Sequence, residues 1–456
     1  MTTPTTTVTR TVADHLAAAS SLELPADVER KTIWHTLDTV AASISGSQLL
    51  AGRRARAFAD LNPMPGPAPL WGHAATAHPI QAAFVNAMAA HADETDDSHA
   101  PSISHPGCGV VPAAFAMAAC RPTSGRQLLR AVAAGYDIGT RMTMALGVST
   151  FDLRGSNPNS HAYASVFGAV AGAMVAAGMD ADQACIGLSY TTQLASGVTT
   201  WLRDSEHVEK AFVFAGMPAR NGVFAATIAA ARWENVPDAF DHHPNFLSAV
   251  SDDPDPVVLT GGLGQVFEIM NTNIKKYAVG SPAQAAVQGA ENLLAQHAFT
   301  ADEVTAIEIK LPAGAAHVTD DRNIPDINTQ YLVAGTLIDR GFSFAMAHDV
   351  ERMEDPAIRK LRDVSTIIPD PTTDGTRSAT VSISLADGRQ LRLFVPHVRG
   401  TVDDPMTEEE IVRKTTDIVE PVLGGPGTRR FLDVMLDLGS LEDIADLGPI
   451  VSGSRL

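Results

Sequence analysis

Cysteine is scarce in this chain, and its few cysteines are not closely spaced. Cys108, Cys120 and Cys185 are the three present, and no Cys-x-x-Cys occurs. Zinc ribbons and iron–sulfur clusters need closely spaced thiolates, so we expect neither. An odd and sparse cysteine count also favours a reducing compartment over a disulfide framework, and we expect the protein to be cytoplasmic.

Long apolar runs and a targeting segment are missing as well. No run of about 18 apolar residues is free of polar breaks, so the sequence predicts no membrane span. Residues 1–13 are rich in threonine and have no apolar core after a basic segment, which argues against a signal peptide.

Positive charge is in deficit, with 33 Lys and Arg against 52 Asp and Glu, which gives a formal net charge of −19. A phosphate backbone needs a basic surface, so we expect no nucleic acid partner. An anionic substrate would need a local cluster of Arg and Lys. Aromatic residues make up only 5% of the chain, whereas 45% is hydrophobic, and we expect small residues to allow tight helix packing.

The first half of the chain has a helical pattern nearly throughout. The pattern predicts a helix that begins after Pro25 and ends at Gly46. Two further helices are expected to begin at the N-cap residues Ser124 and Asp180. Residues 166–177 are predicted to form a helix with almost no polar face. The helix at 166–177 is therefore expected to be buried.

The pattern changes after about residue 265. Alternating polar and apolar residues predict strands over 304–311, 379–385 and 390–395, with Asp387-Gly388 at a hairpin turn between the last two. Helical patterns lie at 283–296 and 330–339, and they return after Pro405. We therefore expect a mainly α protein in which residues 1–265 and 401–456 form a large helical domain, with a smaller α+β lid domain inserted at 266–400.

Residues 91–112 are the most informative stretch. Ala-rich apolar sequence flanks it, and its first fifteen residues hold seven titratable side chains: His91, Asp93, Glu94, Asp96, Asp97, His99 and His105. Such groups between buried helices are costly unless they pair or take part in chemistry. The three later carboxylates are candidate bases, the last two histidines are candidate acids or bases, and Ser98 could orient a substrate oxygen.

Two other interpretations of this stretch stay open. It could be an acidic loop exposed to solvent, or a metal site, since His and Asp are both ligands. The spacing matches no helix-borne metal motif such as His-Glu-x-x-His, so we expect no metal.

Further candidates lie outside this stretch. A Gly/Asn/Pro-rich loop from Arg154 leads to His161 at the start of a buried helix, where backbone N–H groups favour an anion, although a lone histidine there is more often structural. Arg203 and Lys210 are candidate carboxylate clamps in a segment that, taken alone, resembles a solvated turn. The remaining candidates are Lys275 and Lys276, near the domain junction, and Tyr331, which by default belongs to the core.

These pieces, in this order, resemble the MmgE/PrpD family, which includes 2-methylcitrate dehydratases, cis-aconitate decarboxylases and iminodisuccinate epimerases. The resemblance covers nearly the whole chain. It lies in the segments Ala-Ala-Ser-Ile-Ser-Gly46, His91 to Gly107, His161 to Ala173, Gly216-Met-Pro-Ala-Arg-Asn-Gly222 and Tyr331-Leu-Val-Ala-Gly-Thr-Leu.

The resemblance implies the fold expected above, usually as a homodimer, with an active site between the two domains and neither metal nor organic cofactor. The implied site residues are Glu94 or Asp97, Ser98, His105, His161, Lys210 and Tyr331. The family pattern His-x-x-Asp-Phe-Asp-Asp-Thr is His-Ala-Asp-Glu-Thr-Asp-Asp-Ser here, and the spacing from Ser98 to His105 is one residue longer. Lys-x-x-His-x-Gly becomes Lys-Ala-Phe-Val-Phe-Ala-Gly, without its histidine.

Known members share an enolate-like anion beside a carboxylate, which needs one base, one acid and charge-stabilising donors. We expect His161 and His105 to be the acid–base pair, with Glu94 or Asp97 as an orienting group or base. The carboxylates would be held by Lys210, Arg203, Lys275, Lys276 and Arg154, and Tyr331 would donate to a hydroxyl or carboxylate.

The sequence thus predicts a hydro-lyase acting on a small polycarboxylate, similar to 2-methylcitrate dehydratase. Three other functions stay open: an epimerase or isomerase of a substituted succinate, a cis-aconitate-type decarboxylase, and a catalytically inactive binding protein on the same fold.

Overall fold

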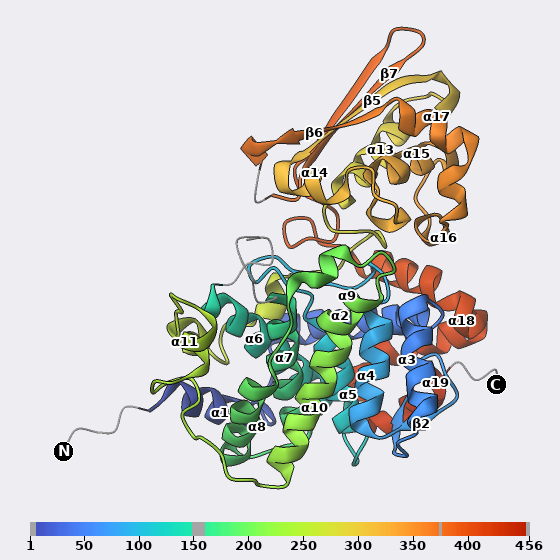
Figure 1. Cartoon of the computed structure of the whole chain (residues 1–456). Helices are drawn as coiled ribbons and strands as arrows, with labels where there is room; N and C mark the ends of the chain where they lie inside the picture. Colours follow the sequence, from blue (N-terminus) through green and yellow to red (C-terminus); the bar gives the residue numbers. More distant parts are fainter. Residues whose placement is uncertain (1–5, 148–159, 374–375, 453–456) are drawn as a thin grey trace. The chain divides into compact units, whose positions relative to one another are not determined.

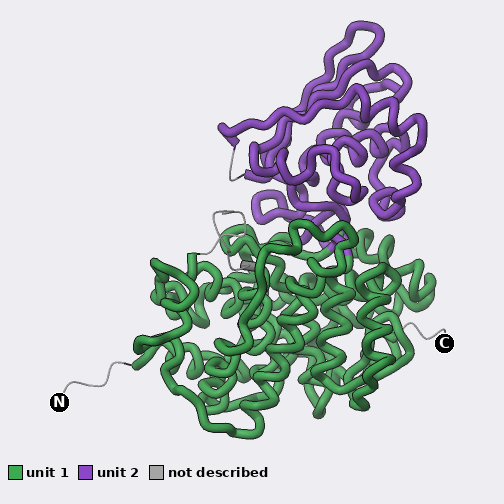
Figure 2. The backbone as a smooth tube through the Cα atoms, in the orientation of Figure 1, with its two compact units in different colours: residues 1–92, 96–273, 411–456 green, residues 93–95, 274–410 purple. Residues whose placement is uncertain are grey.

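The computed structural model describes residues 6–147, 160–373 and 376–452, which fall into two compact units (Figure 2). Unit 1 comprises residues 1–92, 96–273 and 411–456, and unit 2 comprises residues 93–95 and 274–410. The fold is mainly α, as the sequence predicts. The division falls at 273/274 and 410/411, where the sequence placed it near 265 and 400, and residues 93–95 group with the later segment.

Unit 1 is built mostly from helices. They are α1 (Val8–Ala19), α2 (Ala26–Gly46), α3 (Leu50–Leu61), α4 (Pro79–Ala90), α5 (Gly107–Ala118), α6 (Gly125–Leu146), α7 (Ser160–Ala176), α8 (Ala181–Leu194), α9 (Val208–Ala211), α10 (Met217–Ala230), α11 (Phe246–Val250), α12 (Val257–Thr260), most of α18 (Glu408–Leu436) and α19 (Gly448–Val451). Two short antiparallel pairs join β1 (Ala68–Pro69) to β2 (Thr76–Ala77) and β3 (Ser98–His99) to β4 (Thr272–Asn273).

Helix α7 lies at the centre of unit 1 and packs against α5, α6 and α10 (Figure 1). Its residues 161–176 are all buried, which confirms the prediction for this segment. Glycines let α6 and α7 approach closely: a Cβ on Gly139 would lie 2.2 Å from the carbonyl oxygen of Ala164 and 2.9 Å from Cα of Gly168. The small residues thus permit tight helix packing, as expected.

The predicted helix ends are confirmed where side chains cap them. Ser124 Oγ accepts from the amide of Gln127, and Asp180 and Gln183 form a reciprocal capping box at the start of α8. Helix α18 is interrupted at Gly424, whose φ of 70° is left-handed.

Unit 2 contains a four-stranded sheet in the order β6 (Ser365–Asp370), β5 (Val304–Pro312), β7 (Ala379–Leu385) and β8 (Gln390–Val395). Strand β6 pairs parallel to β5, and the other pairs are antiparallel. Strand β7 alternates buried and partly exposed residues, which confirms the predicted hairpin. Strand β6 was not predicted, because its Ser-Thr-Ile-Ile-Pro-Asp sequence does not alternate.

Helix α13 (Gln284–Gln296) packs on β7 and β8, and α15 (Thr329–Asp339) packs against α13. The remaining helices of unit 2 are α14 (Ala313–Thr319), α16 (Phe344–Ala347) and α17 (Pro356–Asp363). In the part of the chain that the structure describes, no helix combines the length and the apolarity that crossing a bilayer would require.

Candidate active site

The loop between α4 and α5 is buried, so the interpretation as an acidic solvent-exposed loop is wrong. Residues 91–99 are all buried. His91 ends α4, strand β3 pairs with β4, and His105 lies just ahead of α5. Because buried carboxylates need partners, the partners of each acidic side chain in this loop indicate its role.

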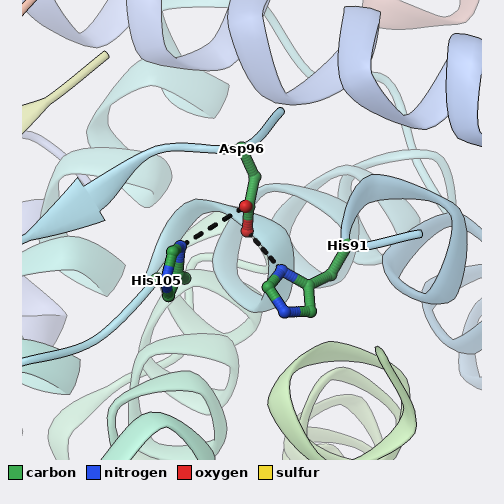
Figure 3. A group of neighbouring side chains, drawn as sticks. All are labelled: His91, Asp96 and His105. Carbon is green, nitrogen blue, oxygen red and sulfur yellow. Dashed lines mark hydrogen bonds and ion pairs between the residues drawn. The ribbon is translucent and has the colours of Figure 1, made fainter. Parts of the chain in front are cut away.

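Asp96 binds two histidines (Figure 3). Its Oδ2 lies 2.7 Å from Nδ1 of His91, and its Oδ1 lies 3.3 Å from Nδ1 of His105. The side chains of His91 and Asp96 are fully buried, whereas 11% of the His105 side chain is exposed. Burial lowers the pKa of His91, although the Asp96 carboxylate acts in the opposite direction. Asp96 therefore orients both rings and stabilises positive charge that forms on them.

His161 lies in the first turn of α7, next to His105. The two rings are 5.2 Å apart, and the His161 ring stacks on Phe214 with centroids 3.9 Å apart. Burial, aided by the nearby His105 and Lys210, holds the pKa of His161 well below its usual value. His161 is therefore neutral near pH 7, which is the form that accepts a proton.

Phe214 is placed by a π-helical turn, Phe212–Gly216, between α9 and α10. Such turns are rare and occur frequently at functional sites. His91 also stacks on Phe214, with centroids 4.8 Å apart. One aromatic ring thus fixes the spacing of two imidazoles.

Lys210 and His207 complete this group. Nζ of Lys210 lies 5.4 Å from the centroid of Phe214 and 5.7 Å from that of Trp201. The His207 ring is 5.3 Å from that of His91, and its backbone is left-handed, with φ of 58°. A non-glycine residue in this region costs free energy and is often found at functional sites. We call His91, His105, His161 and His207 the histidine cluster.

The charges in and around the histidine cluster suit a small anion. Asp96 is the carboxylate that lies against two of its rings, and Lys210 adds an amino group. Binding of a carboxylate here would stabilise the protonated imidazoles, because opposite charges in a buried place interact strongly. Imidazole groups placed in this way can exchange protons with a molecule that reaches them.

Asp97, a predicted acid–base residue, has a different place. Its Oδ2 accepts from the hydroxyl of Tyr136 at 2.5 Å and lies 2.9 Å from Nδ1 of His35, while its Oδ1 accepts from the amide of Gly107. These partners belong to α6, α2 and α5. Asp97 is therefore bound to three helices of unit 1, which gives it a role in holding the loop.

Four predicted site residues lie in unit 2, namely Glu94, Lys275, Lys276 and Tyr331. Nζ of Lys275 donates to the carbonyl and to Oε2 of Glu94, at 3.0 and 3.2 Å. Lys276 donates to Glu291 at 3.0 Å. The hydroxyl of Tyr331 donates to the carbonyl of Met346 at 2.7 Å, and burial raises the pKa of Tyr331 to about 12.

The structure therefore brings together His105, His161 and Lys210 of the predicted site residues in unit 1. Ser98 is buried in β3, Arg203 is exposed, and Arg154 lies outside the described residues. No role was predicted for His91, His207 or Phe214 from the sequence. His91 could have been found from its place in the stretch 91–112, which is rich in titratable residues. Nothing in the sequence indicated a functional role for Phe214.

His91, Asp96 and His105 could also be considered as metal ligands, since each offers one donor atom and these atoms lie within 4.8 Å of one another. Ligands that share a zinc ion at about 2.0–2.2 Å lie about 3.3 Å apart in a tetrahedral site. The 2.7 Å between His91 and Asp96 is instead a charge-assisted hydrogen bond. His91 and Asp96 are thus hydrogen-bonded, and His105 lies within ion-pair distance of the same carboxylate, at 3.3 Å.

Comparison with known proteins identifies the family of this chain. Residues 10–259 match the MmgE/PrpD N-terminal domain and residues 277–439 match the MmgE/PrpD C-terminal domain. A cis-aconitate decarboxylase-like protein of Aspergillus oryzae, oryM, is 23% identical over 487 aligned positions, which cover 99% of this chain and 98% of the relative. Because the two domain matches together span most of its length, the chain belongs to the MmgE/PrpD family.

Proposed function

We propose that this protein is a hydro-lyase that removes water from a small polycarboxylate by acid–base chemistry. The observation that carries this proposal is the placement of the His161 ring 5.2 Å from that of His105, whose Nδ1 lies 3.3 Å from Asp96. Burial, which holds the pKa of His161 well below its usual value, supports its role as the base. A base and an acid at this spacing are what elimination next to a carboxylate requires.

In the proposed reaction His161 takes a proton from the carbon next to a substrate carboxylate. The electron pair of the broken C–H bond forms an enolate-like anion, which the charge of Lys210 stabilises. The anion then forms the carbon–carbon double bond as the C–O bond to the hydroxyl breaks. Protonated His105 gives its proton to the departing oxygen, and the products are an unsaturated acid and water.

A second candidate reaction is the decarboxylation of a cis-aconitate-type acid. The name of the Aspergillus relative, a cis-aconitate decarboxylase-like protein, favours this reaction. Here the C–C bond to one carboxylate breaks, CO₂ leaves, and the electron pair forms a carbanion conjugated with the remaining acid. Protonated His105 then supplies the proton. The two reactions thus share His105 as the acid, and only the elimination needs His161 as a base.

Proton NMR in D₂O with 2-methylcitrate, citrate, cis-aconitate and iminodisuccinate separates these functions. The proposal expects a new vinyl signal from one of the two hydroxy acids. Itaconate from cis-aconitate would instead establish the decarboxylase. Loss of an α-proton signal without a new alkene would indicate an epimerase, and no change with any compound would contradict the proposed hydro-lyase for this substrate group.

Removal of divalent metal is expected to leave activity unchanged, because hydrogen bonds account for the spacing of His91 and Asp96. The protein would be dialysed against EDTA and assayed on the substrate that the NMR panel identifies, with metal content measured before and after. A loss of activity that zinc or iron restores would show that the group binds a metal, and would contradict this prediction.

A further inference from the structure

The loop that carries Asp96 is closed at its base and held at its tip. The hydrogen bond between His91 and Asp96 closes the turn made by residues 92–95. Residues 93–95 group with unit 2, whereas the chain up to Ala92 and from Asp96 belongs to unit 1. Three residues are too few to form a core, so individual polar contacts determine where this tip lies.

The first of these contacts is made by His348, the residue that ends α16. Its Nε2 lies 2.8 Å from Oδ2 of Asp93, and its Nδ1 lies 2.8 Å from the carbonyl oxygen of Phe344. Both ring nitrogens thus face acceptors. A neutral imidazole has a single N–H, so only the protonated ring can donate to both. This geometry therefore favours the charged form of His348, paired with Asp93.

Asp93 is itself fixed within the tip. Its Oδ1 accepts from the amide of Thr95, and its Oδ2 accepts from the hydroxyl of Thr95, both at 2.8 Å. Only 5% of the Asp93 side chain and 17% of the His348 side chain are exposed. The ring of His348 also stacks on Phe344, with centroids 4.0 Å apart. Each partner of this contact is thus held by further contacts of its own.

The second contact is the buried pair of Glu94 and Lys275. The lysine donates to both the backbone carbonyl and the side chain of Glu94, and the side chains are 3% and 4% exposed. A backbone carbonyl that accepts from a buried ammonium fixes the path of the chain as well as the side chain. Asp93 and Glu94 thus bind side chains from two separate parts of unit 2.

We propose that His348, through Asp93, is a positioning residue that fixes the loop between His91 and Asp96 and thereby sets the geometry of the acid–base site. This inference rests on the proposed function for its effect on catalysis. His348 touches none of the reacting groups. Its contribution is to hold Asp93, three residues before Asp96, which in turn orients His91 and His105.

The contact between His348 and Asp93 is expected to depend on pH, because it depends on the charge of His348. Burial alone would lower the pKa of His348. The hydrogen bond to Asp93 and the negative charges of Asp93 and Asp326 instead raise this pKa to about 9. Other polar groups near α16 include the hydroxyl of Tyr331, which donates to the carbonyls of Met346 and Asp349, and the Asp349 side chain, which accepts from the amide of Arg352. The hydroxyl of Ser343 accepts from the amide of Met346. The contact to Asp93 is therefore expected to weaken as the pH rises through about 9.

The test compares His348→Gln, which keeps a donor but loses the charge, with His317→Gln, an exposed histidine of the same unit. In His348→Gln we expect kcat to fall by about 10-fold with KM within about twofold, because misplaced acid–base groups lose rate while substrate is still bound. The loss of wild-type activity near pH 9 should also disappear. His317→Gln should match the wild type in both respects.

A readout independent of activity keeps this inference separate from the proposed function. Amide hydrogen exchange of the peptide covering residues 91–105 should become faster in His348→Gln and in Asp93→Asn, but not in His317→Gln. If exchange and kcat are both unchanged, the positioning role is wrong while the hydro-lyase proposal stands. If the wild type turns over no panel compound but exchange changes as expected, the proposed function fails and the anchoring of the loop is upheld. Asp93→Asn serves as the second variant should His348→Gln not fold.

Discussion

Replacing His161 with alanine is expected to lower kcat by about 10²-fold or more, the usual scale for loss of a general acid or base. His161 is neutral because burial and the neighbouring His105 and Lys210 oppose its protonation. Its removal takes away the proton acceptor and leaves His105, Asp96 and Lys210 in place. KM should therefore change much less than kcat, since the positive charge that binds the substrate is retained.

The matched variants for this prediction are His161→Gln and His242→Ala. Glutamine fills much of the space against Phe214 but cannot act as a base near neutral pH, so His161→Gln should be as inactive as the alanine variant. His242 has 80% of its side chain exposed, and its replacement should leave kcat unchanged. Near-full activity in either His161 variant, with the melting temperature of the wild type, would remove this residue from the mechanism.

The sequence was sufficient for the fold class because the relevant signals are local. Caps such as Ser124 and Asp180, the apolar residues of α7 and the alternation in β7 each depend on neighbours within one element. Strand β6 was missed because its pairing with β5 supplies a stability that its own sequence does not show. Residues 93–95 could not be assigned in advance either, since His348 lies 255 residues from Asp93.

The candidate site was predictable only where residue type implied chemistry. His105 and His161 were predicted because histidine near neutral pH suits proton transfer, and the structure places their rings 5.2 Å apart. The three carboxylates Glu94, Asp96 and Asp97 could not be told apart by sequence. Their partners differ: a lysine for Glu94, two histidines for Asp96, and a tyrosine, a histidine and an amide for Asp97. Only tertiary contacts separate a proton-handling role from a structural one.

Replacing Lys414 with methionine is expected to lower the free energy of unfolding of unit 1 by about 3–5 kcal/mol, the range for breaking a buried ion pair. Nζ of Lys414, on α18, lies 2.6 Å from Oδ1 of Asp38 on α2, and the two side chains are 6% and 1% exposed. Methionine matches the length of the chain but leaves the Asp38 carboxylate buried without its counter-charge. All four tryptophans lie before residue 274, so their fluorescence in urea reports unit 1.

The loss in Lys414→Met should depend on pH in a defined direction. Burial raises the pKa of Asp38 to about 6 even with Lys414 present. Since the folded-state pKa lies above that of the unfolded chain, protonation favours the folded state, and this contribution is lost as the pH rises through about 6. Without Lys414 the folded-state pKa rises further. The variant should therefore be closer to the wild type at pH 5 than at pH 8.

Two further variants separate the buried charge from general damage to α18. Lys414→Met combined with Asp38→Leu removes both charges and should regain most of the lost free energy, because the penalty comes from one unpaired carboxylate. Arg56→Met breaks an exposed pair with Asp60 in the same unit and should cost less than about 1 kcal/mol. If the double variant is no more stable than Lys414→Met, or if the loss is equal at pH 5 and pH 8, the lost stability comes from packing around α18 and the ion-pair explanation is wrong.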